Sequence, residues 1–281
     1  MVKIRKAGTV GFCFGVRRAI NIAQKALNNG SNIYSLGPII HNPLVVKELS
    51  DKGLKVISEV KDAGKGKILI RTHGIAPSVR QKIKQSKKAM IDATCPYVER
   101  LHNIVNNLKK EGFYIIIAGE KNHPEVVALS EAAGANKLIA IDEKQIKRLT
   151  LKNKKVGLLA QTTLAQPLFK KIISAVIDKE PVELRIFNTI CADVLKRQSE
   201  AARLSAGTDI MLIIGGKISA NTKRLAQICK SEGAKTFHVE TDQEIKKSWF
   251  RNCESAGIIS GSSTPSWIVD KVINKIQKNT I

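Results

Sequence analysis

Short apolar runs rich in β-branched residues alternate along the chain with longer stretches in which apolar residues recur every three or four positions. The runs at residues 33–36, 67–71 and 113–118 predict strands, and the last is typical of a strand buried on both faces of a sheet. The stretches at residues 15–29 and 126–133 predict amphipathic helices. Because strands alternate with helices, the pattern predicts parallel sheets joined by right-handed crossovers.

Polar side chains of chemical interest follow the predicted strands. Parallel sheets bind ligands at the carboxyl ends of their strands. Since so many reactive side chains occupy this position, the sequence predicts one composite site. Its candidate residues are His41, His73, Cys95, His123, Glu125, Thr162, Cys191, Ser219, Asn221 and Ser263.

Three cysteines share one local setting. Cys13, Cys95 and Cys191 each stand at the start of a predicted helix, where free N–H groups and the helix dipole favour a thiolate. The chain has no CxxC pair of the kind common in structural zinc sites, although a zinc site held by the three thiolates stays open as an alternative. Three dispersed thiolates suit an iron–sulfur cluster with one iron left without a protein ligand. We expect Cys229 and Cys253 to be structural.

The length, charge and composition of the chain restrict its possible functions. The chain has 281 residues, of which 43% are hydrophobic, which favours two or three small domains. Its net charge of +23 predicts attraction to anions, or else a lysine-rich composition spread over solvated helix faces. Aromatic residues make up only 4%, which argues against stacking platforms for single-stranded nucleic acid. A basic iron–sulfur protein that binds nucleic acid or a phosphorylated ligand without turnover remains the second hypothesis.

The N-terminal residues do not form a secretory signal, and no apolar run approaches the ~20 residues that a membrane-spanning helix needs. The five cysteines are an odd number, which favours a reducing compartment. We therefore expect a cytoplasmic protein without a membrane segment.

The remaining candidates suit an anionic substrate. A cationic or donor cluster is predicted from His41, His73 and His123, and neutral donors are added by Ser219, Asn221 and Ser263. Such a set of donors favours a diphosphate as the ligand. Serine and asparagine also cap helices routinely, so the alternative for each of these residues taken singly is a helix cap. A partly desolvated carboxyl at Glu125, with the Thr162 hydroxyl as a candidate neighbour, could act as an acid; alternatively, Glu125 only favours a helix dipole.

A series of motifs now identifies a family. In chain order, the motifs are Gly11-Phe12-Cys13-Phe14-Gly15-Val16, His41-Asn42-Pro43, Thr72-His73-Gly74, Asp92-Ala93-Thr94-Cys95-Pro96, His123-Pro124-Glu125, Gln161-Thr162-Thr163, Thr189-Ile190-Cys191 and Gly261-Ser262-Ser263-Thr264-Pro265. With this series the chain resembles 4-hydroxy-3-methylbut-2-enyl diphosphate reductases, the LytB or IspH family, over essentially its whole length.

The resemblance implies a fold and a reaction. It implies three small parallel-sheet α/β units in a trefoil around a central [4Fe–4S] cluster, held by Cys13, Cys95 and Cys191. The units would be residues 14–94, residues 95–190, and residues 191–281 with 1–13 added. The reaction would remove the hydroxyl of an allylic diphosphate as water, with electrons from a donor such as ferredoxin or flavodoxin, and yield isopentenyl and dimethylallyl diphosphates.

The resemblance also implies roles for single residues. Glu125 would deliver protons with help from Thr162 and His123. The diphosphate would bind at His41, His73, His123, Thr162, Ser219, Asn221 and Ser263.

The chain departs from the family pattern at a few positions. Ala220 stands where a second serine is usual, Ile218 where asparagine is usual, and Asp193-Val194 where Ala-Thr is usual. The losses of hydroxyl groups predict weaker substrate binding, and Asp193 adds a carboxylate close to the third cysteine.

Overall fold

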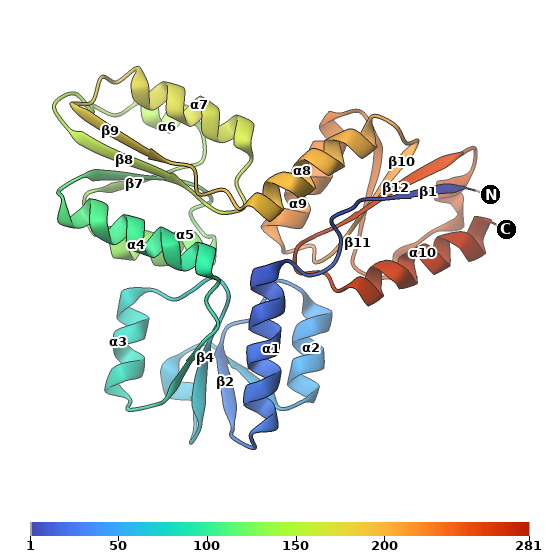
Figure 1. Cartoon of the computed structure of the whole chain (residues 1–281), viewed down its shortest axis with the longest axis horizontal. Coiled ribbons are helices and arrows are strands. Elements are labelled where there is room, and N and C mark those ends of the chain that lie inside the picture. The colour runs from blue at the N-terminus through green and yellow to red at the C-terminus, as the bar shows by residue number, and fades with distance from the viewer. Residues whose placement is uncertain (1, 281) are drawn as a thin grey trace. The chain divides into compact units, whose positions relative to one another are not determined.

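The structure, a computed structural model, describes residues 2–280. Within these residues the strands form three four-stranded sheets, and all strand pairs are parallel (Figure 1). The predicted α/β class with three parallel sheets is therefore confirmed. In the same residues no helix is both long and apolar enough to cross a bilayer.

The chain divides into two compact units. The terminal unit comprises the residues up to Arg17, the segment Ile40–Glu48 and the residues from Ala192 on. The central unit comprises Arg18–Ile39 and Leu49–Cys191. Two of the three sheets lie in the central unit and one in the terminal unit. The finer division, with boundaries after residues 94 and 190, stays a proposal.

The terminal unit contains the sheet with strand order β1-β12-β10-β11. Lys3 pairs with Ser255, so the first strand of the chain lies beside the last one. The strands are β1 (Lys3–Lys6), β10 (Ile210–Ile214), β11 (Lys235–Val239) and β12 (Ser255–Ser260). The helices are α8 (Ala192–Ser205), α9 (Ala220–Ser231), α10 (Ser266–Thr280) and two 3-10 turns, η2 (Asp242–Glu244) and η3 (Lys247–Phe250).

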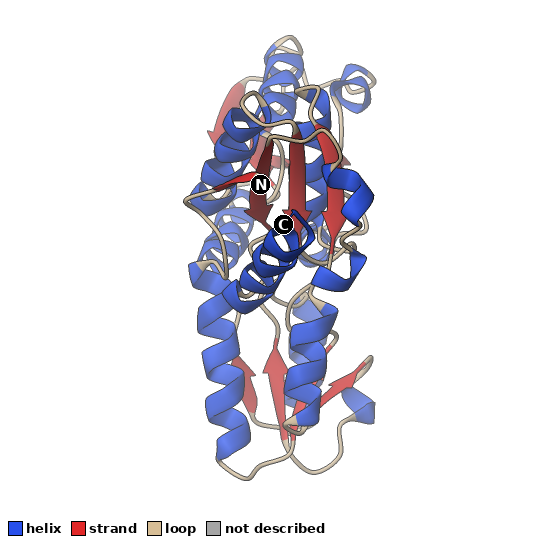
Figure 2. Ribbon diagram, turned by 90° about the vertical axis from the view of Figure 1, so that its right-hand side faces the viewer, coloured by secondary structure: helices blue, strands red, loops and turns tan. Residues whose placement is uncertain are grey.

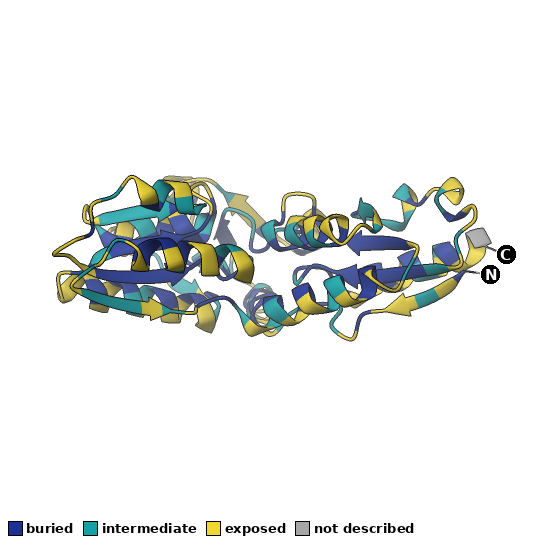
Figure 3. Ribbon diagram, turned by 90° about the horizontal axis from the view of Figure 1, so that it is seen from above, coloured by how far each residue is buried: buried dark blue, intermediate teal, exposed yellow. Residues whose placement is uncertain are grey.

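Helices cover both faces of this sheet. Side chains alternate across a strand, so neighbouring residues of β10 enter different cores. Leu212 packs in one core with Val272 of α10, and Ile213 packs in the other with Leu225 of α9. Figure 2 shows α10 against the sheet, and Figure 3 shows the buried strands in dark blue between partly exposed helices. Cys229 is fully buried in the second core, as expected of a structural cysteine.

The central unit contains the sheets β3-β2-β4-β5 and β7-β6-β8-β9. The strands of the first are β2 (Ile33–Leu36), β3 (Leu54–Ile57), β4 (Lys67–Ile70) and β5 (Met90–Asp92). Those of the second are β6 (Tyr114–Ala118), β7 (Lys137–Ala140), β8 (Lys155–Ala160) and β9 (Glu183–Phe187). Strand β6 is buried over most of its length, which explains its almost wholly apolar sequence.

Helices follow the strands of the central unit, and α1 and α2 include residues of both units. The helices are α1 (Phe14–Asn28), α2 (Pro43–Asp51), α3 (Pro77–Gln85), α4 (Pro96–Lys110), α5 (Pro124–Ala133), α6 (Glu143–Lys147), α7 (Gln166–Ile177) and the 3-10 turn η1 (Val60–Asp62). The two sheets of this unit are linked through α3 and α5, because the backbone N–H and the hydroxyl of Ser78 donate to the Glu131 carboxylate at 2.6 and 2.9 Å.

One predicted boundary is wrong. The sequence places Glu125 in a loop before a helix that begins at residue 126, whereas α5 begins at Pro124 and has His123 as its N-cap. Proline suits this position because it lacks an N–H and its φ is already helical. Glu125 therefore lies in the first turn of a helix, which fixes its backbone more firmly than a loop would.

Candidate active site

The two middle strands of each sheet precede candidate residues. In both sheets of the central unit the connections that follow these strands leave in opposite directions, and ligands of open α/β sheets bind outside the carboxyl ends at such points. In the terminal unit β12 is the last of the described strands and lies beside β10. The strands concerned are β2 and β4, β6 and β8, and β10 and β12. Along the chain they are followed by the predicted site residues His41 and His73, His123 and Thr162, and Ser219 and Ser263.

Two of the predicted histidines lie together in the central unit. The rings of His73 and His123 form an edge-to-face pair with centroids 5.5 Å apart. His123 is buried, and its Nδ1 accepts a hydrogen bond from the backbone N–H of Glu125 at 3.3 Å. Because Nδ1 is an acceptor, the neutral ring carries its proton on Nε2, which can donate to an anionic ligand.

Glu125 and Thr162 are in direct contact. Glu125 is only 1% exposed. Its two carboxylate oxygens accept from the Thr162 backbone N–H at 2.8 Å and from the Thr162 hydroxyl at 2.7 Å. Burial raises the pKa of Glu125, although the two bonds from Thr162 lower it in part. The carboxyl therefore holds a proton to higher pH than an exposed glutamate, as a general acid requires.

Cys95 and Cys191 belong to the same unit as this acid. Cys95 is the N-cap of α4, and its backbone N–H donates to Thr72 O at 3.0 Å; the Cys191 N–H donates to Thr162 O at 2.9 Å. Cys95 is close enough to Cys191 and Glu125 for their charges to act on its thiol. The central unit therefore brings two of the three predicted ligand cysteines together with the buried carboxyl.

The expected thiolate at Cys95 needs a correction. Burial raises the pKa of this thiol, the backbone N–H groups of Tyr97 and Val98 lower it, and the charges of Cys191 and Glu125 raise it further. The net direction is upward, so the helix N-terminus does not outweigh desolvation. Binding of a metal by Cys95 would therefore have to release the proton of this thiol.

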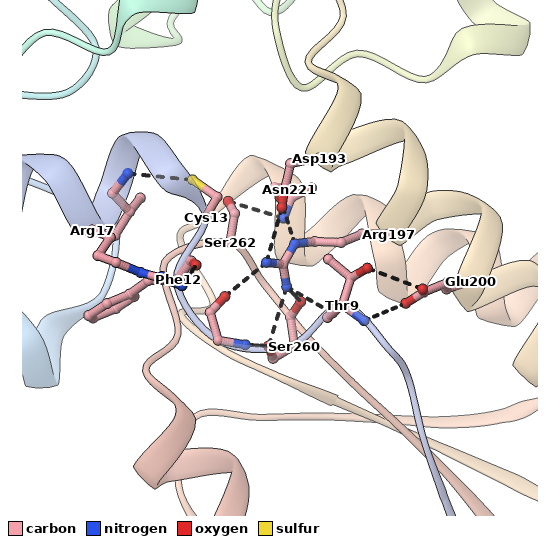
Figure 4. Close-up of polar contacts among 12 residues, drawn as sticks. Thr9, Phe12, Cys13, Arg17, Asp193, Arg197, Glu200, Asn221, Ser260 and Ser262 are labelled. Carbon is pink, nitrogen blue, oxygen red and sulfur yellow. Dashed lines mark hydrogen bonds and ion pairs between the residues drawn. The ribbon is translucent and has the colours of Figure 1, made fainter.

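Cys13 lies in the terminal unit, directly before α1. Its backbone N–H donates to Ser262 O at 3.0 Å, and its sulfur accepts from the Val16 backbone N–H at 3.5 Å (Figure 4). The N–H of a first helical turn thus points at the sulfur, the arrangement that stabilises a thiolate.

The predicted neutral donors of the terminal unit are buried. Ser219 is the N-cap of α9 and accepts from the Thr222 backbone N–H at 3.4 Å, so it does act as a cap. Asn221 is 3% exposed, and its Nδ2 donates to Ser262 Oγ at 3.4 Å, whereas its Oδ1 has no hydrogen-bond partner in the described structure. A buried amide oxygen without a partner is costly, so this atom would accept a hydrogen bond from a ligand group that donates one.

The backbone around His41 is fixed by its contacts within the terminal unit. The Ser263 hydroxyl donates to His41 O at 3.3 Å, and Asn42 Nδ2 donates to Ser263 O at 3.0 Å. A Cβ on Gly216 would lie 2.5 Å from His41 O, so only glycine fits there. Sequence reasoning quoted Asn42 within a motif but missed its role, which also includes capping α2 through Leu44 N.

The contacts of a second set of residues were missed. The Arg197 side chain is 1% exposed and contacts the backbone of the segment before Cys13. Its partner Asp193 was noted only as a departure from a pattern. No sequence signal shows that an arginine two turns after Cys191 reaches residues near the other end of the chain.

Comparisons with known proteins agree over the whole chain. The family described as "LytB protein" matches residues 4–277. A 4-hydroxy-3-methylbut-2-enyl diphosphate reductase of Syntrophotalea carbinolica is 43% identical over 276 residues, which are 98% of each chain. The enzyme of that name from Aquifex aeolicus is 39% identical over 282 residues, covering 99% of this chain and 97% of the relative.

Solved structures give the same result. The E-1-hydroxy-2-methyl-but-2-enyl-4-diphosphate reductase of Plasmodium falciparum superposes with a TM-score of 0.93 at 28% identity, covering 97% of this chain and 87% of that one. A second structure, described as the terminal enzyme of the non-mevalonate pathway, has a TM-score of 0.72 at 38% identity and covers 99% of this chain and all of the other.

Proposed function

Because the chain belongs to the LytB family of 4-hydroxy-3-methylbut-2-enyl diphosphate reductases, we propose that it reduces that allylic diphosphate to isopentenyl and dimethylallyl diphosphates. In this reaction the C–O bond to the hydroxyl breaks, a C–H bond forms, and two electrons and two protons are consumed as water leaves. It is the last step of the methylerythritol phosphate route to isoprenoids. The observation that carries the proposal is the buried Glu125–Thr162 pair in the unit that also holds Cys95 and Cys191.

We assign Cys13, Cys95 and Cys191 as the ligands of one [4Fe–4S] cluster. The three cysteines fit this group, because none of them forms a disulfide and each is half-buried. Each also directly precedes a helix, which is α1, α4 or α8. Held by three thiolates, such a cluster supplies electrons and one iron that is open to the hydroxyl group of the substrate. Cys253 is near a loop after η3, and Cys229 is in the core, so neither belongs to this set.

Glu125 is the proposed proton donor. Its carboxyl is held in one orientation by two hydrogen bonds from Thr162, and burial raises its pKa, so it holds its proton to higher pH than an exposed glutamate. Proton transfer from a positioned carboxyl contributes about 10²- to 10⁴-fold to a rate. Thr162 keeps the carboxyl in place and, through its hydroxyl, can pass a proton on. His123, whose Nε2 carries a proton in the neutral ring, is the third proposed participant.

The diphosphate group would be bound by neutral and ionisable donors. We propose that the binding set is His41, His73, His123, Thr162, Ser219, Asn221 and Ser263. What supports it is the burial of Asn221 and Ser263, since donors withdrawn from water bind a multiply charged anion more strongly than exposed ones. Helix N-termini at α5 and α9 add oriented backbone N–H groups.

The electrons must come from another protein. We propose an acidic one-electron carrier such as a ferredoxin or flavodoxin, because a chain of net charge +23 attracts acidic partners. A cytoplasmic location would suit such a partner and a diphosphate substrate, and it is part of the proposal.

One anaerobic experiment tests this function. The chain is reconstituted with iron and sulfide, bound iron is counted, and turnover is followed with a reduced viologen dye and the hydroxymethylbutenyl diphosphate. We expect four irons per chain and formation of both isoprenyl diphosphates. A protein that carries the cluster yet forms neither product would contradict the proposal and favour a cluster protein with another phosphorylated ligand.

A further inference from the structure

The segment before Cys13 has no regular secondary structure but is held closely. Residues 7–13 connect β1 to α1, and the segment turns at Gly11, whose φ of +82° is in the left-handed region that favours glycine. The Gly11 backbone N–H donates to Ser260 Oγ at 3.0 Å, and the Cys13 N–H donates to Ser262 O at 3.0 Å. The end of β12 and the loop after it thus accept from two backbone donors of the segment.

One arginine donates to two backbone carbonyls of this segment and to one of β12. Arg197 Nη1 donates to Thr9 O at 3.1 Å and to Ser260 O at 2.8 Å, and Nη2 donates to Gly11 O at 2.9 Å (Figure 4). A guanidinium has five N–H donors in a rigid, planar fork, so these bonds fix the relative positions of the carbonyls that they join.

Asp193 is the counterion of this buried guanidinium. Its Oδ2 accepts from Arg197 Nε at 2.7 Å and its Oδ1 accepts from Nη2 at 3.4 Å, across one turn of α8. The Arg197 side chain is 1% exposed and that of Asp193 is 27% exposed. Because Asp193 keeps part of its hydration, it compensates the buried charge without itself being fully desolvated.

A third side chain of the same helix face completes the contact. Glu200 Oε2 accepts from the Thr9 backbone N–H at 2.8 Å, and its Oε1 accepts from the Thr9 hydroxyl at 3.1 Å. The spacings of four and three residues from Asp193 through Arg197 to Glu200 put all three on one face of α8. This face is therefore built to hold residues 9–11.

We propose that Asp193 and Arg197 are positioning residues that fix the backbone of residues 9–13 and so set the place of the Cys13 thiol before iron binds. We call Asp193, Arg197 and the carbonyls of Thr9, Gly11 and Ser260 the Arg197 clamp. The proposal rests on the proposed role of Cys13 as a cluster ligand. Helix α8 begins at Ala192, next to Cys191 in the chain, so the clamp connects the segment before one proposed ligand to the helix that follows another.

A preorganised ligand lowers the cost of ordering the chain when the cluster binds, and it slows the loss of iron. Asp193→Asn removes the counterion, and Arg197→Lys keeps the charge but removes the fork. Asp193→Glu restores the charge with one more methylene and is the conservative rescue. Asp270→Asn, at an exposed position of α10, is the matched control because it makes the same chemical change in the same unit.

The first readout is amide hydrogen exchange in the apoprotein under anaerobic, reducing conditions. We expect peptides that cover residues 7–13 to exchange on the order of tenfold faster in Asp193→Asn and Arg197→Lys than in the parent, because their local opening is no longer opposed by the clamp. Peptides of α10 and the whole Asp270→Asn variant should exchange as the parent does. Asp193→Glu should recover most of the protection.

The second readout is the rate at which a chelator removes iron from the reconstituted protein. Loss of supporting contacts around metal ligands typically weakens metal binding roughly 10- to 100-fold, and we expect a similar acceleration for both clamp variants. Unchanged exchange of residues 7–13 in both variants would overturn the proposal. So would an equal rise throughout the terminal unit, which would mean a general role in stability. Exchange in the apoprotein needs no iron, so failure of the chain to bind a cluster would contradict the proposed function and not the clamp.

Discussion

The central and terminal units contribute different chemistry to the candidate site. The central unit holds the groups that can exchange protons, the buried Glu125 and the His73–His123 pair, together with two cysteines. The terminal unit holds mostly neutral donors, such as Ser219 and Asn221, on loops fixed by close backbone contacts. The difference indicates that substitution of the proton-donating carboxyl in the central unit should lower the rate of the reaction, whereas substitution of the neutral donors in the terminal unit should weaken binding.

The largest effect is expected from a cysteine of the central unit. Cys95→Ser replaces a soft sulfur ligand by a hydroxyl, so the reconstituted protein should lose the brown colour and most of its bound iron. Cys229→Ser is the matched control, because Cys229 is fully buried in the core of the terminal unit. It should lower the free energy of unfolding by about 1–3 kcal/mol through a poorly paired hydroxyl, with the iron content unchanged. Equal iron loss in both variants would contradict the ligand assignment.

Thr162→Val should change the pH dependence of the rate. Both hydrogen bonds from Thr162 lower the pKa of Glu125, and the variant keeps only the backbone one, so the pKa of Glu125 should rise further. Because a proton donor acts in its protonated form, the rate should fall as pH rises through the pKa of Glu125. This alkaline limb of the pH–rate profile should move to higher pH in Thr162→Val. Loss of the relay hydroxyl should also lower kcat roughly 10- to 100-fold.

Thr162→Ser should restore both the position of the alkaline limb of the pH–rate profile and most of kcat, because it restores the hydroxyl. A profile that is identical in Thr162→Val and the parent protein would show that Glu125 is not the group whose titration limits the rate.

Asn221→Ala tests the terminal unit. Removal of a buried amide that contacts the diphosphate should cost about 1–3 kcal/mol of binding, which raises KM roughly 5- to 150-fold while kcat changes little. Steady-state kinetics over a range of substrate concentrations separate the two constants. A drop in kcat at constant KM would break the proposed division between the units.

The smallest effect is expected from Ala220→Ser. Ala220 is the first residue of α9, next to the cap Ser219, and a serine there would add one hydroxyl donor near Asn221. We expect KM to fall a few-fold with kcat unchanged. An unchanged KM would mean that the added hydroxyl does not reach the diphosphate.

Much of the fold could be predicted because strong local signals agree with the three-dimensional structure. The apolar run at residues 113–118 contains strand β6, which is buried within a parallel sheet, and the loops with reactive side chains follow the two middle strands of each sheet. The contact between Glu125 and Thr162 could be proposed because both residues follow neighbouring strands, β6 and β8.

The rest depends on contacts that the sequence does not encode locally. The carbonyls bound by Arg197 belong to Thr9, Gly11 and Ser260, and backbone acceptors have no residue-type signature. The direction of the Cys95 pKa was predicted wrongly, because the helix N-terminus is visible in the sequence while the degree of burial is not. The predicted loop at Glu125 is wrong because Pro124 is the first residue of α5, and the placement in a first helical turn matches the alternative that Glu125 favours a helix dipole.

The most direct test of the account is the turnover of Glu125→Gln, which keeps the size of the side chain and one acceptor oxygen but removes its acidic proton. We expect unchanged iron content, nearly unchanged substrate affinity, and a kcat lower by about 10²- to 10⁴-fold, measured anaerobically with a reduced viologen dye. Glu232→Gln, an exposed change at the end of α9, should react at the parent rate. A Glu125→Gln protein that reacts at nearly the parent rate would contradict the assignment of the buried carboxyl as the proton donor.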